Sequence, residues 1–329
     1  MKKLSTKPIP IAGFIILSIM VTVLLLSAVN ESWFAHPAAG ILATIIAAGT
    51  FFAIYLEGKS LLAQEIQPVA VSRKLFEFLA VVVGGVITFY LSCDIGLGAV
   101  VASSLVGILA AMIVPKYGAA AYCGSFVGMS SSALFCQYSD VAFASAIAGL
   151  VYVITRDTFA GFGGKLGTIA FIGASSAAFM LGREFLIAPI PDWNTSLWVL
   201  LFAFIAAPLT FYLNCNLNNG PVLASGAVGL LGGLILPVIF PQIGSQLAVV
   251  VICASFTGMS NTTRCPKFWH MWIAGLFTGI LFVFTTPLLG GAGGKLGTIA
   301  FASIISTNGF IKIYQKYHRD EARHYSNQV

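Results

Sequence analysis

The stretch GGKLGTIAF occurs twice in the chain, at residues 163–171 and again at residues 293–301, which lie 130 positions apart. Short matches are common in an apolar chain, but a nine-residue identity that contains Lys and Thr is not. Three further blocks match in the same order, at offsets of 122, 122 and 130 residues: ITFYLSC (87–93) with LTFYLNC (209–215), VASSLVGILAAMIVP (101–115) with LASGAVGLLGGLILP (223–237), and CGSFVGMSS (123–131) with CASFTGMSN (253–261). The sequence therefore indicates an internal duplication.

The composition restricts the chain to one broad class of protein. Of its 329 residues, 58% are hydrophobic and 9% are charged, and the mean hydropathy is +0.94. Soluble domains carry about 25% charged residues. This chain has too few charges to cover a surface exposed to water, so we predict a polytopic, all-α membrane protein whose solvent is the lipid bilayer.

Apolar segments of membrane-spanning character recur along the whole chain. The first is interpreted as a transmembrane helix and not as a signal peptide, because no A-x-A cleavage pattern follows it. Some of the segments rich in small residues could instead be re-entrant or discontinuous. The twelve expected segments are roughly 9–29, 37–57, 75–92, 97–115, 118–136, 139–156, 164–183, 195–214, 221–240, 245–262, 268–288 and 296–314.

The basic residues predict the orientation. If the N-terminus is cytoplasmic and all twelve segments cross, all of the 17 Lys and Arg residues except Arg183 and Lys295 lie on the cytoplasmic side. Cytoplasmic loops of membrane proteins are enriched in Lys and Arg. We therefore expect both termini in the cytoplasm and a location in the plasma membrane, here a bacterial inner membrane.

Each duplicated unit holds five segments. Because five is an odd number, the second unit enters the membrane from the opposite side, which predicts two inverted repeats related by a pseudo-two-fold axis in the membrane plane. Inverted repeats are common in secondary transporters. The expected organisation is a cytoplasmic N-terminus (1–8), a transmembrane helix pair with a cytoplasmic loop (9–74), membrane repeat 1 (75–190), membrane repeat 2 (191–314) and a basic cytoplasmic tail (315–329).

The repeated glycine-lysine turn is the first candidate site. Its glycines can end one helix and begin the next, which places a lysine in the first turn of the new helix. A cation there opposes the helix dipole, whereas an anion would be bound by free N–H groups, the ammonium and a threonine hydroxyl. The alternative is that the lysines reach the membrane interface and the glycines only pack. The candidate substrate-binding residues are Gly163, Gly164, Lys165, Thr168, Gly293, Gly294, Lys295 and Thr298.

The second candidate site is the pair of hydroxyl-rich segments, CGSFVGMSS and CASFTGMSN. Glycine-broken segments are tolerated at membrane depth where they are buried in protein or line a cavity. Packing of helices through small residues is an equally direct explanation. The candidate residues are Ser125, Ser130, Ser131, Ser255, Thr257, Ser260 and Asn261.

The acidic residues indicate the sign of the substrate. None occurs between residues 193 and 319, and the counterpart of Asp94 in the second copy is Asn216. A symmetric relay of carboxylates for protons is therefore absent from the second copy, which favours an anion or a small neutral solute over a cation. The six cysteines show no C-x-x-C spacing and are interpreted as packing residues, and we predict neither a metal site nor a cofactor.

These patterns favour a membrane transport protein for a small solute, with an anion as the expected substrate. The alternatives are a channel for a small neutral solute and a membrane-embedded subunit of an enzyme or assembly complex. The chain contains no H-E-x-x-H or G-x-S-x-G motif, so we predict that it is not an enzyme and has no catalytic residues. The expected partners are a small-molecule or ion substrate and the bilayer, without nucleic acid. Association into a homo-oligomer is left open.

Overall fold

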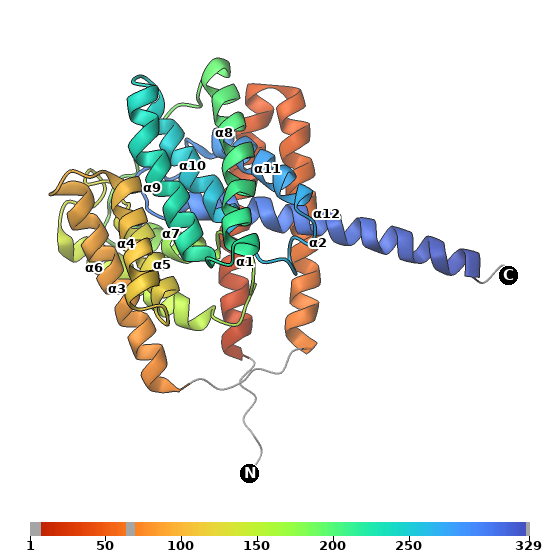
Figure 1. The fold of residues 1–329 in the computed structure, drawn as a ribbon, viewed down its shortest axis with the longest axis horizontal. Helices are drawn as coiled ribbons and strands as arrows, with labels where there is room; N and C mark the ends of the chain where they lie inside the picture. Colours follow the sequence, from red (N-terminus) through yellow and green to blue (C-terminus); the bar gives the residue numbers. More distant parts are fainter. Residues whose placement is uncertain (1–7, 64–69, 327–329) are drawn as a thin grey trace, which may run out of the picture.

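The computed structural model describes residues 8–63 and 70–326, and this part of the chain is built from twelve helices and one short π-helical turn, without strands. The all-α prediction is therefore confirmed. Most of the predicted N-terminal segment 1–8, part of the predicted loop before residue 74 and the last three residues of the predicted tail lie outside the described residues. Figure 1 shows the first two helices, α1 (Pro8–Ala35) and α2 (Pro37–Ala63), as an antiparallel pair.

The remaining helices begin and end within a few residues of most of the predicted segments. The notable exception is the segment 118–136, of which only the first part is helical. The helices are α3 (Val71–Cys93), α4 (Ala99–Ile113), α5 (Gly118–Gly128), α6 (Tyr138–Ile154), α7 (Lys165–Met180), α8 (Trp193–Phe211) with the π-helical turn Tyr212–Asn216, α9 (Pro221–Ile239), α10 (Gly244–Gly258), α11 (Trp269–Thr285) and α12 (Lys295–Ser326).

Six of these helices are long and apolar enough to cross a membrane: α1, α2, α3, α8 with its π-helical turn, α9, and α12 as far as His318. A helix needs about 20 apolar residues to span the hydrocarbon core. The other six, α4, α5, α6, α7, α10 and α11, have 17 residues or fewer. The structure thus indicates a membrane protein, and the number of segments that cross stays a prediction.

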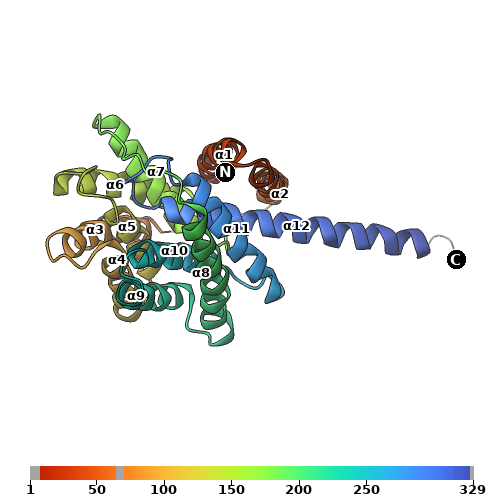
Figure 2. The same ribbon diagram turned by 90° about the horizontal axis from the view of Figure 1, so that it is seen from above.

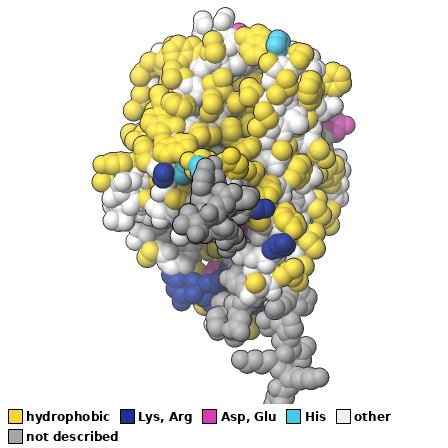
Figure 3. Space-filling view, turned by 90° about the vertical axis from the view of Figure 1, so that its right-hand side faces the viewer, with side chains coloured by type: hydrophobic (Ala, Val, Ile, Leu, Met, Phe, Trp, Pro, Cys, Tyr) yellow, Lys and Arg dark blue, Asp and Glu magenta, His cyan; other side chains and the backbone are white. Residues whose placement is uncertain are grey.

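The surface agrees with a lipid environment. Figure 3 shows a face covered largely by hydrophobic side chains, with Lys and Arg gathered toward its lower part. Large apolar side chains that a soluble protein would bury are exposed, among them Phe34 on α1, Leu197 on α8 and Val238 on α9. An apolar patch of this extent on a protein surface marks contact with a membrane or a partner.

Helix α12 forms the centre of the molecule. Its apolar window is 78% buried, against 33–44% for the other five long helices. Figure 1 shows that α12 runs nearly perpendicular to α1 and α2 and projects beyond them, and Figure 2 shows α1 and α2 on one side of α12 with α8 and α9 on the other. The elements outside the duplication therefore cover one flank of the central helix.

Helices α7 and α12 cross where two glycines meet. A Cβ on Gly167 would lie 2.5 Å from the Cα of Gly297, so neither position has room for a side chain. Each helix begins directly after a glycine with positive φ, Gly164 at 76° and Gly294 at 87°. Glycine adopts this backbone conformation without steric cost, which explains why the turns that start both central helices are glycine-rich.

Candidate functional site

Each glycine-lysine turn lies against the hydroxyl-rich segment of the other copy, and not against that of its own copy. The Gly163 N–H donates to Ser260 Oγ at 2.9 Å, and the Gly293 N–H donates to Ser130 Oγ at 3.0 Å. A second pair of bonds repeats the pattern: Ser131 N–H to Gly291 O at 2.9 Å, and Asn261 N–H to Gly161 O at 3.0 Å. In each case the two bonds are related by the same offset of 130 residues.

A cavity of about 570 Å³ lies beside the second of these contacts. It is bounded by the ends of α3 and α5, the starts of α4 and α12, and two side chains of α10. Of the predicted site residues, it brings together five. Its lining residues are Ser92, Cys93, Ala99, Val100, Phe126, Met129, Ser130, Ser131, Ser132, Val249, Phe256, Gly291, Ala292, Gly293, Gly294, Lys295 and Leu296.

The lining of this cavity is positive and rich in hydroxyl groups. Lys295 is the one charged residue among the described residues that line it, and Ser130, Ser131 and Ser132 supply hydroxyls. The first turn of α12 also leaves backbone N–H groups without intrahelical acceptors. The dipole of α12 adds positive potential at the same place, so an anion is the solute that this lining favours.

The ammonium groups of both lysines cap the helix that precedes them. Lys295 Nζ donates to the carbonyl oxygens of Thr285, Thr286 and Leu288 at 3.2, 3.1 and 2.8 Å, beyond the last turn of α11. Lys165 Nζ makes the matching bonds after α6: Arg156 O at 3.0 Å and Thr158 O at 2.6 Å. A cation at a helix C-terminus satisfies free carbonyls and is favoured by the dipole.

This arrangement differs from both sequence interpretations of the lysines. The three N–H groups of Lys295 are matched by three carbonyl oxygens, so its charge acts on the cavity through space and not by direct hydrogen bonds. The lysine opposes the dipole of its own helix α12 but supports that of α11. The signal in the sequence was the position of each lysine, about ten residues after the end of a long apolar segment.

Two aromatic rings form the inner end of the cavity, and sequence reasoning missed them. Phe126 and Phe256 lie at equivalent positions in the two copies, and their ring centroids are 4.4 Å apart. The ring of Tyr122 packs 4.4 Å from Phe126, and its hydroxyl shares a hydrogen bond with Ser225 Oγ at 3.0 Å. The signal was available, because this phenylalanine is identical in CGSFVGMSS and CASFTGMSN.

Several predicted site residues lie away from the cavity. Ser125 shares a hydrogen bond with Ser103 on α4, and Ser255 shares one with Ser225 on α9, so both join neighbouring helices. Thr257 joins α10 to α11 through Thr278 in the same way. Thr168 donates to Gly164 O, and the buried Thr298 hydroxyl has no hydrogen-bond partner among the described residues. These hydroxyls serve helix packing.

The first copy of the turn has much less open space beside it. Gly163, Gly164, Lys165, Ser260 and Asn261 come together there as their counterparts do around the large cavity. The cavity next to them measures about 110 Å³ and is bordered by the side chain of Arg264, which comes from the connection between α10 and α11. At the equivalent position beside the large cavity the chain has Leu134.

The described residues contain no cluster of three or more His, Cys, Asp or Glu side chains that could hold a metal ion. The six cysteines, all within the described ranges, are free thiols. Comparisons with protein-family models, with curated proteins and with solved structures found no match to this chain. The argument for function therefore depends on the geometry alone.

Proposed function

We propose that the chain is a membrane transport protein that moves a small anion through a site between two inverted repeats, 75–190 and 191–314. The observation that carries the proposal is the exchange of motifs between the copies: each glycine-lysine turn is held by a serine of the other copy, and one such contact borders a cavity of about 570 Å³. Transporters with inverted repeats place their substrate site at this kind of interface, at the starts of discontinuous helices.

The two ends of the molecule support a transport path that is open on one side. Cys93, which lines the large cavity, is the last residue of α3, whereas the small cavity includes Glu57 near the end of α2 that leads into α3. Helix α3 has 23 residues, about 35 Å at 1.5 Å per residue. The two cavities therefore lie toward opposite faces, with Phe126 and Phe256 at the inner end of the large one.

The proposed orientation follows from the positive-inside rule. With a cytoplasmic N-terminus, the small cavity faces the cytoplasm and the large one faces the outside of the plasma membrane. The substrate sign follows from the lining, in which Lys295 and the start of α12 contribute positive potential and the described lining residues include no carboxylate.

The test is solute flux in proteoliposomes that contain the purified chain. The panel comprises formate, acetate, chloride and nitrate as anions, and urea and glycerol as neutral solutes. Native Cys93 provides the specificity control, since a bulky charged thiol reagent attached to it would fill the cavity. We expect anion flux that the reagent blocks, and flux that resists the reagent in Cys93→Ser, which retains the exposed Cys136.

The outcomes separate the classes. Flux of urea or glycerol without flux of anions would favour the channel for neutral solutes. If no solute of the panel crosses, the transport proposal is wrong and the membrane-subunit alternative takes its place. Anion flux that the thiol reagent blocks equally in Cys93→Ser would move the path away from this cavity.

A further inference from the structure

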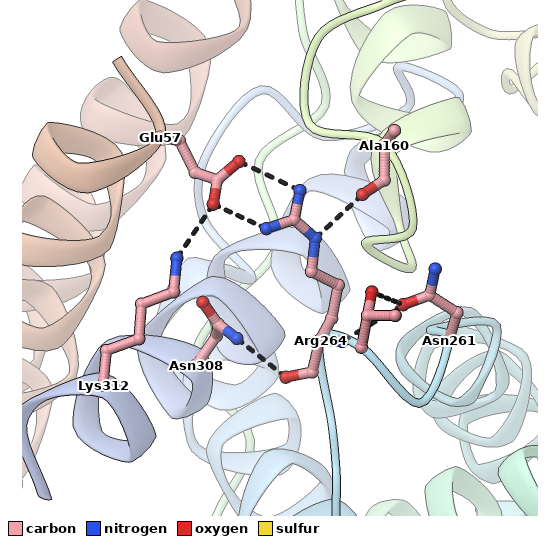
Figure 4. A network of polar contacts seen from close by, with 7 residues as sticks. Glu57, Ala160, Asn261, Arg264, Asn308 and Lys312 are labelled. Atoms are coloured by element: carbon pink, nitrogen blue, oxygen red, sulfur yellow. Dashed lines mark hydrogen bonds and ion pairs between the residues drawn. The ribbon is translucent and has the colours of Figure 1, made fainter. Parts of the chain in front are cut away.

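A buried cluster of ionic side chains lies beside the first copy of the turn, and Figure 4 shows its members. Arg264 Nη1 and Nη2 contact the two carboxylate oxygens of Glu57 at 2.6 and 3.0 Å, which is a bidentate pair. Lys312 Nζ on α12 contacts Glu57 Oε1 at 3.0 Å. The Glu57 side chain is only 8% exposed, so one carboxylate satisfies two cations away from water.

The guanidinium is held by groups other than Glu57. Arg264 Nε donates to Ala160 O at 2.9 Å, and the guanidinium carbon lies 4.3 Å from the centre of the Phe162 ring. Its own backbone is fixed at both ends, by Asn261 Oδ1 at 3.1 Å and by Asn308 Nδ2 at 2.8 Å. The positively charged fork is therefore arranged in advance for a planar, two-oxygen ligand.

The carboxylate that fills this fork comes from outside the duplicated part of the chain. Glu57 belongs to α2, whereas Arg264 and Lys312 belong to the second copy. Asp157 also borders the small cavity, so the cluster already contains two carboxylates for its two cations. A further anion would be repelled while Glu57 stays, and it would be accepted only in exchange for Glu57.

We propose that Arg264 and Lys312 form a binding site for a small carboxylate on the cytoplasmic side, and that Glu57 occupies it here as an internal ligand. The proposal rests on the proposed function, because it names the class of anion that leaves or enters the path at this face. A tethered carboxylate has a high effective concentration, so a free carboxylate binds only when Glu57 has moved away.

The experiment measures binding of acetate to the purified full chain in detergent by thermal unfolding, with chloride at equal ionic strength as the reference. Glu57→Ala vacates the fork. We expect acetate to raise the Tm of Glu57→Ala by about 3 °C or more and to change that of the wild type less. The matched control is Glu57→Ala with Arg264→Leu, which installs the leucine that the first copy carries at Leu134 and should remove the acetate effect.

A second variant covers the case in which Glu57→Ala does not fold. Glu57→Asp keeps the charge but shortens the side chain by one methylene, so acetate should stabilise it by an intermediate amount. The proposal is overturned if acetate has no larger effect than chloride on the variant that folds, or if the effect survives Arg264→Leu.

Binding in detergent requires no transport, so the two proposals fail separately. An acetate effect without any flux in proteoliposomes keeps the carboxylate site and refutes transport. Anion flux without an acetate effect keeps transport and refutes the carboxylate site.

Discussion

The two glycine-lysine turns have the same sequence over nine residues and the same local hydrogen bonds, yet their surroundings differ. The turn at 291–296 borders a cavity of about 570 Å³, whereas the turn at 161–166 has about 110 Å³ beside it. The difference arises from residues outside the repeated motif: Leu134 lies against Gly291 in one case, and Arg264 reaches across to Glu57 in the other. Identical motifs thus set the local fold, and divergent neighbours decide which side is open.

The largest expected effect comes from giving the open side the arginine of the closed side. Leu134 is fully buried, and α2, which supplies the carboxylate for Arg264, lies at the other turn. Leu134→Arg should therefore bury an uncompensated charge and lower the free energy of unfolding by about 3–5 kcal/mol. Thermal unfolding in detergent measures this, with Leu134→Met as the control for volume. A melt like that of the wild type would show that the open side can accommodate a cation.

The next effect tests the crossing of the two central helices. A Cβ on Gly297 would lie 2.4 Å from the Cα of Gly167, so Gly297→Ala must separate the two backbones. We expect a loss of about 3 kcal/mol, and the same loss for Gly167→Ala because the contact is shared. Gly58→Ala is the control, since its Cβ would meet only the Phe14 ring at 3.2 Å. Unequal losses at the two glycines would show that the crossing is not symmetric.

The lysine caps should give smaller and unequal effects. Lys295→Met leaves three carbonyl oxygens without a donor, and Lys165→Met leaves two. The expected losses are about 2 kcal/mol for Lys295 and about 1 kcal/mol for Lys165, since unsatisfied buried acceptors are costly. Thermal unfolding without added anions checks them, and the exposed Lys316→Met should change nothing. Full stability of Lys295→Met would return this lysine to a role in direct anion contact.

The smallest perturbation is chemical labelling of two equivalent thiols. Cys93 is exposed in the large cavity, whereas its counterpart Cys215 is partly buried, with Sγ 3.5 Å from Ser260 O. A hydrophilic maleimide should therefore modify Cys93 well before Cys215, because reaction requires access. Peptide mapping by mass spectrometry gives the two rates. Equal rates would mean that both sides open on the timescale of labelling.

Local features of this fold could be predicted from the sequence because they depend on neighbouring residues. Apolar length and glycine turns located the helices to within a few residues, and they placed Lys165 and Lys295 as the first residues of α7 and α12. The cross-contacts could not be predicted, since Gly163 and Ser260 are 97 residues apart. Repeat matching shows which segments are equivalent, but it does not show which copy each one contacts.

The ionic contacts show the same limit. From proximity in the sequence, Glu77 was expected to pair with Lys74, but it contacts Arg73 at 3.2 Å and Arg156 at 3.1 Å. The cluster of Glu57 and Arg264 joins residues 207 positions apart. A buried carboxylate selects the cation that the packing brings to it, so these partners follow from the arrangement of helices and not from the spacing of charges.

The meeting of Gly167 with Gly297 has a consequence for the origin of the chain. The two residues are the same position in the two copies, and each occupies the space that the other leaves free. A contact of a residue with its own equivalent is what a two-fold symmetric dimer contains at its axis. A single half-length chain, inserted into the membrane in both orientations, could form this contact with itself before any gene fusion, and the glycine would then have been selected once for both sides.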